Sequence, residues 1–292
     1  MNKDRNNSLV STQQLEQCLR DSDLRIFDVS VILESNPNGY GYLPKSGYEN
    51  WSNGHIPGGG FLDVIEELSD QSNPLGFMMP PVDQLARTLG QKGIVEGSKV
   101  ILYNSGIPMW ATRVWWMLRS IGLRNVAVLD GGWDKWCKES RPVSVDPCQY
   151  EPSPLSAHPE DHMWIGKNEM LKAVENGTPL AINALSPAVY SGKKNQYGRP
   201  GHLPGSWNVY YADLIDDQTG EFKTTANLIG SFEPSGALDA EHVITYCGGG
   251  ISATALCFAL HLCGQENVAV YDGSMSEWVH DDKLPLKLGN DP

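Results

Sequence analysis

The stretch Asn125-Val126-Ala127-Val128-Leu129-Asp130-Gly131-Gly132-Trp133-Asp134-Lys135-Trp136 occurs twice in this chain of 292 residues. The second copy is Asn267-Val268-Ala269-Val270-Tyr271-Asp272-Gly273-Ser274-Met275-Ser276-Glu277-Trp278, with 7 of 12 positions identical at a spacing of 142 residues. A repeat of this length is typical of a duplicated structural unit. The sequence therefore predicts two copies of one fold.

Shorter matches upstream support the duplication. Val100-Ile101-Leu102-Tyr103-Asn104 corresponds to Val243-Ile244-Thr245-Tyr246-Cys247, and Gly54-His55-Ile56-Pro57-Gly58 corresponds to Gly201-His202-Leu203-Pro204-Gly205. Between the copies lie Pro142, Pro147, Pro152, Pro154 and Pro159, a density that helix interiors and central strands do not accept. We therefore expect a first domain at 1–141, a proline-rich linker at 142–162 and a second domain at 163–292.

Within each copy, short runs rich in β-branched residues alternate with helical patterns. The expected strands are residues 25–29, 99–103, 126–129, 180–182, 242–246 and 268–271, and the clearest helices are residues 111–121 and 252–262. Strands that are continuously apolar and joined by helices are typical of a parallel sheet covered on both faces. The predicted fold class is α/β, with two tandem domains, each a mostly parallel sheet flanked by helices.

Composition narrows the classes of function. Hydrophobic residues make up 40% and charged residues 20%, which is an ordinary globular balance, and the net charge is −13. That charge disfavours nucleic acid or an anionic membrane surface as a partner, and an anionic small substrate would need a local exception. The chain has neither an 18-residue apolar run nor an apolar leader at its start, so we expect a cytoplasmic protein.

Cysteine usage points to one reactive position. The six cysteines lack the spacing of a zinc site, so no metal is expected, and reduced thiols are the default in the cytoplasm. Cys247 follows the strand ending at Tyr246 and opens a loop, Gly248, Gly249, Gly250, Ile251 and Ser252, that leads into a helix. Glycines let several backbone N–H groups point at one centre, and the helix N-terminus favours a thiolate over a thiol. Cys247 is therefore the candidate nucleophile.

Two chemistries use a cysteine loop ahead of a helix. Phosphatases place an arginine at the sixth position after the cysteine, whereas that position here is Ala253, and the loop carries no cation. A small loop of amides suits an intermediate with one diffuse negative charge, such as a cysteine persulfide. The residues therefore favour persulfide chemistry over phosphoryl chemistry.

These elements together resemble a known family over nearly the whole chain. The sequence is similar to the tandem-domain rhodaneses, the thiosulfate and 3-mercaptopyruvate sulfurtransferases. The similar motifs are the two Gly-His-x-Pro-Gly turns, Arg113-Val114-Trp115-Trp116, Leu129-Asp130-Gly131-Gly132, the Cys247 loop, and Tyr271-Asp272-Gly273-Ser274 followed by Glu277-Trp278. The resemblance implies an inactive first copy and a catalytic second copy. Asn104, at the first-copy position that matches Cys247, fits this because an amide cannot form a persulfide.

The chain departs from both branches of that family. Thiosulfate-specific members usually carry basic residues directly after the cysteine, where this chain has Gly248 and Gly249. The mercaptopyruvate branch usually has a serine proposed to help proton transfer, and Gly249 offers no hydroxyl. In both branches an aspartate and an arginine follow the first strand of the second domain. This chain has Asn183 and Leu185 at those positions. The sequence therefore leaves the sulfur donor open.

Three further residues are candidates for binding the donor. The family places gripping arginines near the loop that contains Lys194 and Arg199, and a guanidinium can bind a carboxylate with two hydrogen bonds. His55 matches a histidine that the mercaptopyruvate branch is thought to bring to the interdomain cleft, where it could protonate a leaving enolate. The alternatives are a solvated loop for the two cations and a structural turn for His55.

The sequence thus predicts a sulfurtransferase that moves sulfane sulfur from thiosulfate or 3-mercaptopyruvate through a Cys247 persulfide to cyanide or a thiol. The partners implied are a small anionic donor and a thiol or thioredoxin-like acceptor, without metal or organic cofactor. The alternative is a low-turnover carrier that delivers the persulfide sulfur to a protein partner.

Overall fold

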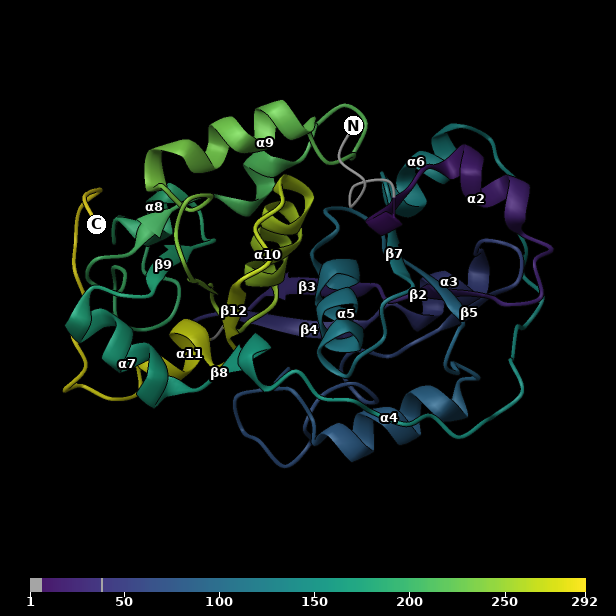
Figure 1. Ribbon diagram of the computed structural model, residues 1–292, viewed down its shortest axis with the longest axis horizontal. Helices are drawn as coiled ribbons and strands as arrows, with labels where there is room; N and C mark the ends of the chain where they lie inside the picture. Colours follow the sequence, from purple (N-terminus) through teal and green to yellow (C-terminus); the bar gives the residue numbers. More distant parts are fainter. Residues whose placement is uncertain (1–6, 38) are drawn as a thin grey trace.

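Two five-stranded sheets, one in each half of the chain, form the body of the protein (Figure 1). The computed structural model describes residues 7–37 and 39–292. The strands of the first sheet are all parallel and run in the order β1 (Leu9–Val10), β7 (Val126–Leu129), β6 (Lys99–Tyr103), β2 (Leu24–Asp28) and β5 (Gly59–Phe61). Helices α2 (Thr12–Cys18), α3 (Tyr48–Asn53), α4 (Val82–Gln91), α5 (Met109–Ser120) and α6 (Gly132–Lys138) belong to this half.

The second sheet repeats the first. Its parallel strands run in the order β8 (Trp164–Ile165), β12 (Val268–Tyr271), β11 (Val243–Tyr246), β9 (Leu180–Asn183) and β10 (Trp207–Asn208). Helices α7 (Lys167–Asn176), α8 (Pro187–Tyr190), α9 (Thr225–Phe232), α10 (Ser252–Cys263) and α11 (Ser274–Trp278) accompany it. The two sheets have the same topology strand for strand, so the predicted fold class and the internal duplication are confirmed.

The two halves meet along helices α5 and α10, which lie beside each other in the middle of the molecule (Figure 1). Both are buried over most of their length, and a helix that is apolar on all sides packs against neighbours all round. Trp115 of α5 meets Phe258 of α10 edge to face, with ring centroids 4.8 Å apart. The hydroxyls of Thr112 and Thr254 lie 3.0 Å apart in the same interface. The interface therefore belongs to the core of the protein.

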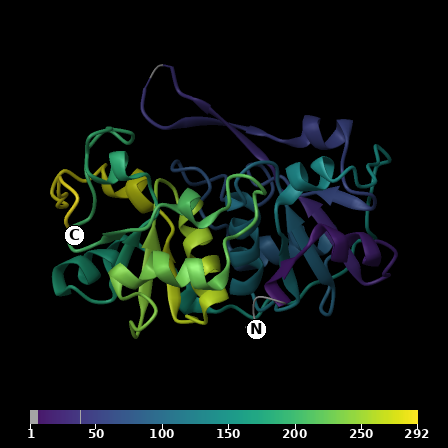
Figure 2. The same ribbon diagram turned by 90° about the horizontal axis from the view of Figure 1, so that it is seen from above.

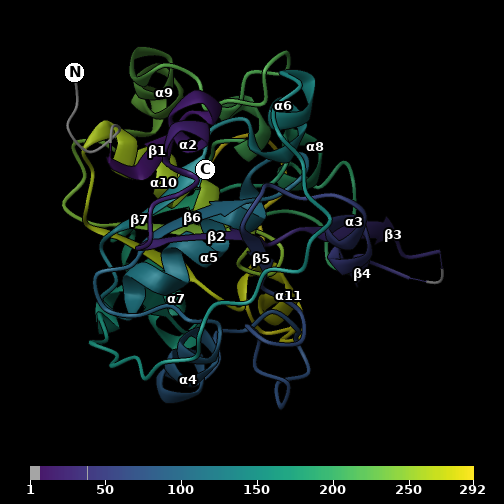
Figure 3. The same cartoon turned by 90° about the vertical axis from the view of Figure 1, so that its right-hand side faces the viewer.

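A hairpin of the first half extends over the second half (Figure 2), and Figure 3 shows it projecting from the body of the molecule. Its antiparallel strands are β3 (Val31–Ser35) and β4 (Tyr42–Ser46). Near the tip, the N–H of Gly41 donates to the carbonyl of Gln196 at 2.9 Å. The hairpin thereby joins the loop that follows α8 in the second half.

The proline-rich segment between the halves follows an extended path. Residues 145–160 form no helix or strand, and three of their N–H groups bond to carbonyls of the first half, Ser153 to Gly90, His158 to Ile121 and Glu160 to Ser120. The expected domain limits themselves stay a prediction. Among the described residues, no helix combines the length and apolarity required to cross a membrane.

Candidate active site

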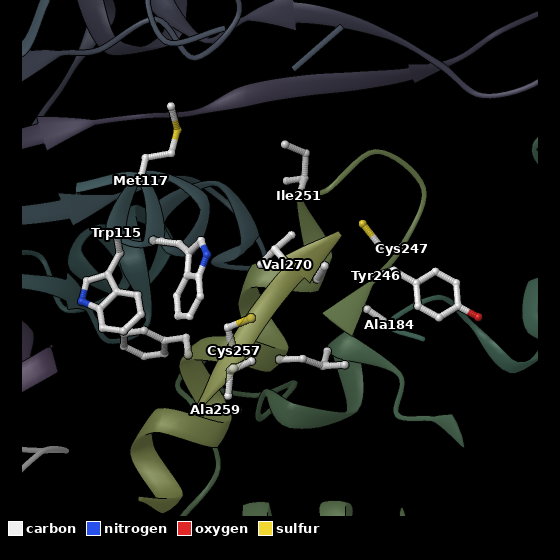
Figure 4. Packing of buried hydrophobic residues seen from close by; sticks show 14 of the residues in the cluster. Trp115, Met117, Ala184, Tyr246, Cys247, Ile251, Cys257, Ala259 and Val270 are labelled. Carbon is white, nitrogen blue, oxygen red and sulfur yellow. The ribbon is translucent and has the colours of Figure 1, made fainter. Parts of the chain in front are cut away.

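Cys247 lies where β11 ends and the loop to α10 begins (Figure 4). The strand is buried along its whole length, which fixes the position of the cysteine that follows it. Cys247 exposes 2% of its surface, yet it lines a cavity of about 590 Å³ together with Gly248, Gly249, Ile251 and Ser252. The thiol is therefore shielded from bulk solvent but faces a space large enough for a small substrate.

Three carbonyls of the Cys247 loop accept hydrogen bonds from the segment after β12 and from Arg113. The carbonyl of Cys247 accepts from the N–H of Met275 at 3.1 Å, and that of Gly248 accepts from the N–H of Ser276 at 2.8 Å. The carbonyl of Gly250 accepts from Arg113 Nη1 at 3.3 Å. In a trans peptide the N–H points opposite to the carbonyl, so the N–H groups of Gly248, Gly249 and Ile251 point away from these partners. Within the described residues, none of these three N–H groups bonds to protein.

The loop is not wholly free to bind a ligand through its amides. Ser274 Oγ accepts from the N–H of Cys247 at 3.0 Å and from that of Gly250 at 3.2 Å, and it donates to the carbonyl of Tyr271 at 2.7 Å. The expectation that Gly250 contributes its N–H to a persulfide is therefore wrong. Gly250 instead supplies the turn, since its φ of +76° lies in the left-handed region that favours glycine.

Arg113 of the first half supports the loop from behind. Its guanidinium is 1% exposed, bonds to Asp272 Oδ1 at 2.6 Å, and lies over the ring of Trp164. Asp272 Oδ2 in turn accepts from the N–H of Met79 at 2.7 Å. A buried ion pair is stable only when its remaining donors and acceptors are satisfied, and here both halves of the chain supply them. The loop of the second half thus depends on a side chain from the first.

The equivalent loop of the first half has the opposite arrangement. Asn104 Nδ2 donates to the carbonyls of Ser105 at 2.6 Å and Ile107 at 3.0 Å, and its Oδ1 accepts from the N–H of Ala111. Carbonyls that turn toward the side chain would repel an anion at this place. This geometry supports the expectation that the first copy is inactive, beyond its lack of a cysteine.

The cavity draws its walls from both halves and is rich in aromatic side chains. Among the described residues it is lined by Tyr40, Tyr42, Phe77, Trp110, Tyr197, Tyr210 and Tyr211, with Lys194 and His280 as its basic members. No Asp or Glu of the described chain lines it, although the protein carries a net charge of −13. The wall is thus a local exception to the acidic field of the protein.

Burial and the nearby Cys247 raise the pKa values of two cavity tyrosines. Burial, and then negative charge on Cys247, raises the pKa of Tyr197 well above its usual value. Burial, followed by Tyr210, Tyr42 and Cys247, raises the pKa of Tyr211 to about 12. Both phenols therefore keep their protons at neutral pH and can act as hydrogen-bond donors.

The structure places only one of the three expected donor-binding side chains at the cavity. Lys194 lines it. Arg199 instead donates to the carbonyls of Asp281 and Leu284, both at 2.8 Å, which fixes the C-terminal segment. It does not line the cavity, so the structure does not bring it to Cys247 as expected, and its role in donor binding stays a prediction.

His55 also lies outside the cavity. It is 1% exposed, stacks on Trp51, and its ring nitrogens lie 2.9 and 3.0 Å from the carbonyl oxygens of Trp51 and Asp146. His202 in the second half shows the same arrangement with the carbonyls of Tyr190 and Asp291. Two equivalent histidines with the same backbone contacts favour the alternative of a structural turn, and a role of His55 at the donor stays a prediction.

Sequence reasoning missed the residues that shape the loop from a distance. Arg113, Asp272 and Ser274 lie within motifs that carry the family resemblance, but the motifs alone assign them no contact. Tyr197 and Tyr211 lie in no repeated motif. Only the folded chain brings them to Cys247.

Comparisons with known proteins show which family the chain belongs to. The sequence model of the rhodanese-like domain matches residues 11–139 and 168–281. The chain is 29% identical over 281 residues to a 3-mercaptopyruvate sulfurtransferase of Escherichia coli K12, covering 95% of this chain and 97% of the relative. It is 30% identical over 284 residues to a thiosulfate sulfurtransferase of Cricetulus griseus, covering 94% and 92%.

Among solved structures, the chain is similar to SseA from Escherichia coli, described as a 3-mercaptopyruvate sulfotransferase with the rhodanese fold. The TM-score is 0.80 at 28% identity, over 91% of this chain and 98% of the other. The chain therefore belongs to the family of rhodanese-like domain proteins and carries the domain twice. The expected class of enzyme, a sulfurtransferase, is confirmed.

Proposed function

We propose that this protein takes a sulfane sulfur atom onto Cys247 from a small anionic donor and passes it to cyanide or a thiol. The observation that carries the proposal is the Cys247 loop, whose carbonyls are bound from behind while the amides of Gly248, Gly249 and Ile251 have no protein partner in the described chain. An anion on the cysteine sulfur is the ligand that such a loop would hold.

With thiosulfate as donor, the reaction needs no other reagent. The Cys247 thiolate attacks the outer sulfur, a new S–S bond forms, and the S–S bond of thiosulfate breaks with its electron pair leaving on sulfite. With 3-mercaptopyruvate, the C–S bond breaks instead with its electron pair leaving on carbon, and the proton of the donor's own thiol converts the enolate to pyruvate and leaves the persulfide as the anion. The persulfide then gives its outer sulfur to cyanide, forming thiocyanate, or to a thiol.

The cavity fits an anionic donor of this kind. Lys194 supplies a cation on a wall that, among the described residues, has no carboxylate, so the electrostatic cost of bringing an anion to this acidic protein is lowered there. Relatives named for either donor match at nearly equal identity, and the cavity has no arginine among its described wall residues. Both donors therefore belong in the test. All six cysteines are free thiols, so Cys247 is available for the cycle.

The first prediction concerns Cys247→Ser. We expect this variant to take up no sulfur and to form no thiocyanate above background, because a hydroxyl does not form the persulfide. Wild-type protein should gain the mass of one sulfur atom on Cys247 after exposure to thiosulfate or 3-mercaptopyruvate. Intact-protein and peptide mass spectrometry would measure uptake, and thiocyanate release would measure turnover.

Cys137→Ser is the matched control, because Cys137 is an exposed thiol in α6 and does not line the cavity. It should behave like the wild type. Full activity in Cys247→Ser would overturn the proposal. A stable persulfide without turnover would point to the carrier function instead of the enzyme.

A further inference from the structure

Tyr197 lines the cavity and lies against the Cys247 loop. It lies in the segment after α8, and its ring lies against Gly248, the residue directly after Cys247. A side-chain carbon built on Gly248 would lie 1.9 Å from the Tyr197 oxygen and 2.4 Å from the ring carbon that bears it. The phenol therefore occupies the space that any larger residue at 248 would need.

The hydroxyl of Tyr197 makes no hydrogen bond to any described part of the chain. Other buried tyrosines of this half do, since Tyr190 donates to the carbonyl of Ser206 at 2.5 Å and Tyr271 donates to Glu277 Oε2 at 2.9 Å. A partly buried hydroxyl without a partner is unfavourable unless a ligand or water completes it. The Tyr197 hydroxyl thus lies at the cavity, and its O–H group can donate a hydrogen bond to a ligand.

The Tyr197 hydroxyl would donate its hydrogen bond to a negatively charged sulfur atom. Burial and the nearby Cys247 both favour the protonated phenol, so the group can donate but not act as a base at neutral pH. The wall offers few cations to an anionic sulfur, because Lys194 is exposed and the loop carries none. A neutral O–H beside the sulfur stabilises a negative charge without a counter-ion.

We propose that Tyr197 is a catalytic residue that donates a hydrogen bond to the sulfur held on Cys247, first the attacking thiolate and then the outer sulfur of the persulfide. The inference rests on the proposed function, because it needs an anionic sulfur at this place. Tyr197 itself transfers no proton: the S–S bond forms and the sulfur donor's own bond to sulfur breaks as described above, while the O–H bond of Tyr197 stays intact.

The test is Tyr197→Phe, which removes one oxygen and keeps the ring against Gly248. Sulfur uptake would be followed by rapid quench and intact mass, with whichever of thiosulfate and 3-mercaptopyruvate loads the wild type. A hydrogen bond to a charged group is worth on the order of a tenfold effect, so we expect uptake about tenfold slower at saturating donor. The donor concentration at half-maximal uptake should change by less than about twofold, since the bond is made to the reacting sulfur.

Tyr48→Phe serves as the control. Tyr48 is an exposed tyrosine of the first half, outside the cavity, and loses the same hydroxyl. It should load at the wild-type rate, and circular dichroism with thermal unfolding should show that both variants are folded.

The outcomes separate this inference from the proposed function. Equal uptake by wild type and Tyr197→Phe would overturn the role of Tyr197 while leaving the persulfide function intact. A variant that loads at the normal rate but needs much more donor would also overturn it, because the hydroxyl would then bind the donor and not the reacting sulfur. Failure of the wild type itself to load from either donor would overturn both.

Discussion

Asp28 and Asn183 end equivalent strands, β2 and β9, and make the same local contact. Asp28 Oδ1 accepts from the N–H of Ser30 at 2.8 Å, and Asn183 Oδ1 accepts from the N–H of Leu185 at 2.7 Å. One copy therefore achieves with a neutral amide what the other does with a buried carboxyl. Burial raises the pKa of Asp28 to about 6, against which the bonds to Ser30 act only in part.

The sign of the effect on stability follows from the raised pKa. The folded protein holds the Asp28 proton more tightly than the unfolded chain, so its contribution is favourable below about pH 4 and is lost as the pH rises through about 6. Two units of pKa correspond to about 2–3 kcal/mol. At neutral pH the charged carboxyl therefore opposes folding.

We predict that Asp28→Asn raises the free energy of unfolding by about 2–3 kcal/mol at pH 7.5 and by about half as much at pH 5. Urea unfolding at the two pH values would measure this. The reciprocal change Asn183→Asp should lower stability at pH 7.5. A gain in the free energy of unfolding of Asp28→Asn that did not depend on pH would contradict the raised pKa of Asp28.

At the scale of the elements, helix α5 carries Arg113 across the interface to the loop between β11 and α10. The ion pair with Asp272 and the bond to the carbonyl of Gly250 join three elements at one point. Because the charges are buried, removal of one partner leaves the other uncompensated. The first half thus helps to hold the Cys247 loop of the second half.

We predict that Arg113→Met lowers the free energy of unfolding by about 3–5 kcal/mol and slows sulfur uptake at temperatures where the protein is folded. Chemical unfolding and rapid-quench mass spectrometry would measure the two effects. Arg124→Met, which breaks the exposed pair with Glu160, is the matched control and should cost less than about 1 kcal/mol. Similar costs for the two variants would refute the proposed support of the loop.

The sequence predicts some strands well and others not at all. The continuously apolar runs gave the central strands within about one residue, with β11 expected at 242–246 and found at Val243–Tyr246. The edge strands β1, β8 and β10 have two residues each, and β4 is mostly exposed, so neither length nor periodicity marks them. Their pairing depends on neighbours that are distant in sequence.

At the scale of the whole molecule, the hairpin of the first half forms part of the wall of the cavity at Cys247. The hairpin β3–β4 brings Tyr40, Gly41 and Tyr42 to the cavity wall, and Gly41 bonds to Gln196 of the second half (Figure 2). Ser35 and Tyr42 pair directly across the hairpin, so the described residues between them, 36–37 and 39–41, lie outside both strands. The tip can therefore be shortened without loss of either strand.

We predict that replacing residues 36–41 by Asn-Gly, a two-residue turn suited to antiparallel strands, raises the donor concentration needed for half-maximal uptake severalfold. The rate at saturating donor should fall less, because the Cys247 loop is untouched. Steady-state kinetics with each donor would separate the two parameters. Unchanged kinetics would mean that the tip takes no part in donor binding.

The sequence by itself determined the duplication and the parallel α/β fold and singled out Cys247 as the candidate nucleophile, since these follow from local patterns: a repeat, apolar strands and a glycine loop before a helix. It did not determine which side chains meet that cysteine. Arg199 and His55 were expected at the cavity from their place in the family's motifs, but both bind backbone carbonyls elsewhere. Tyr197 and Arg113 reach the loop only because the chain folds across its two halves, and contacts between residues far apart in sequence are set by packing and not by local pattern.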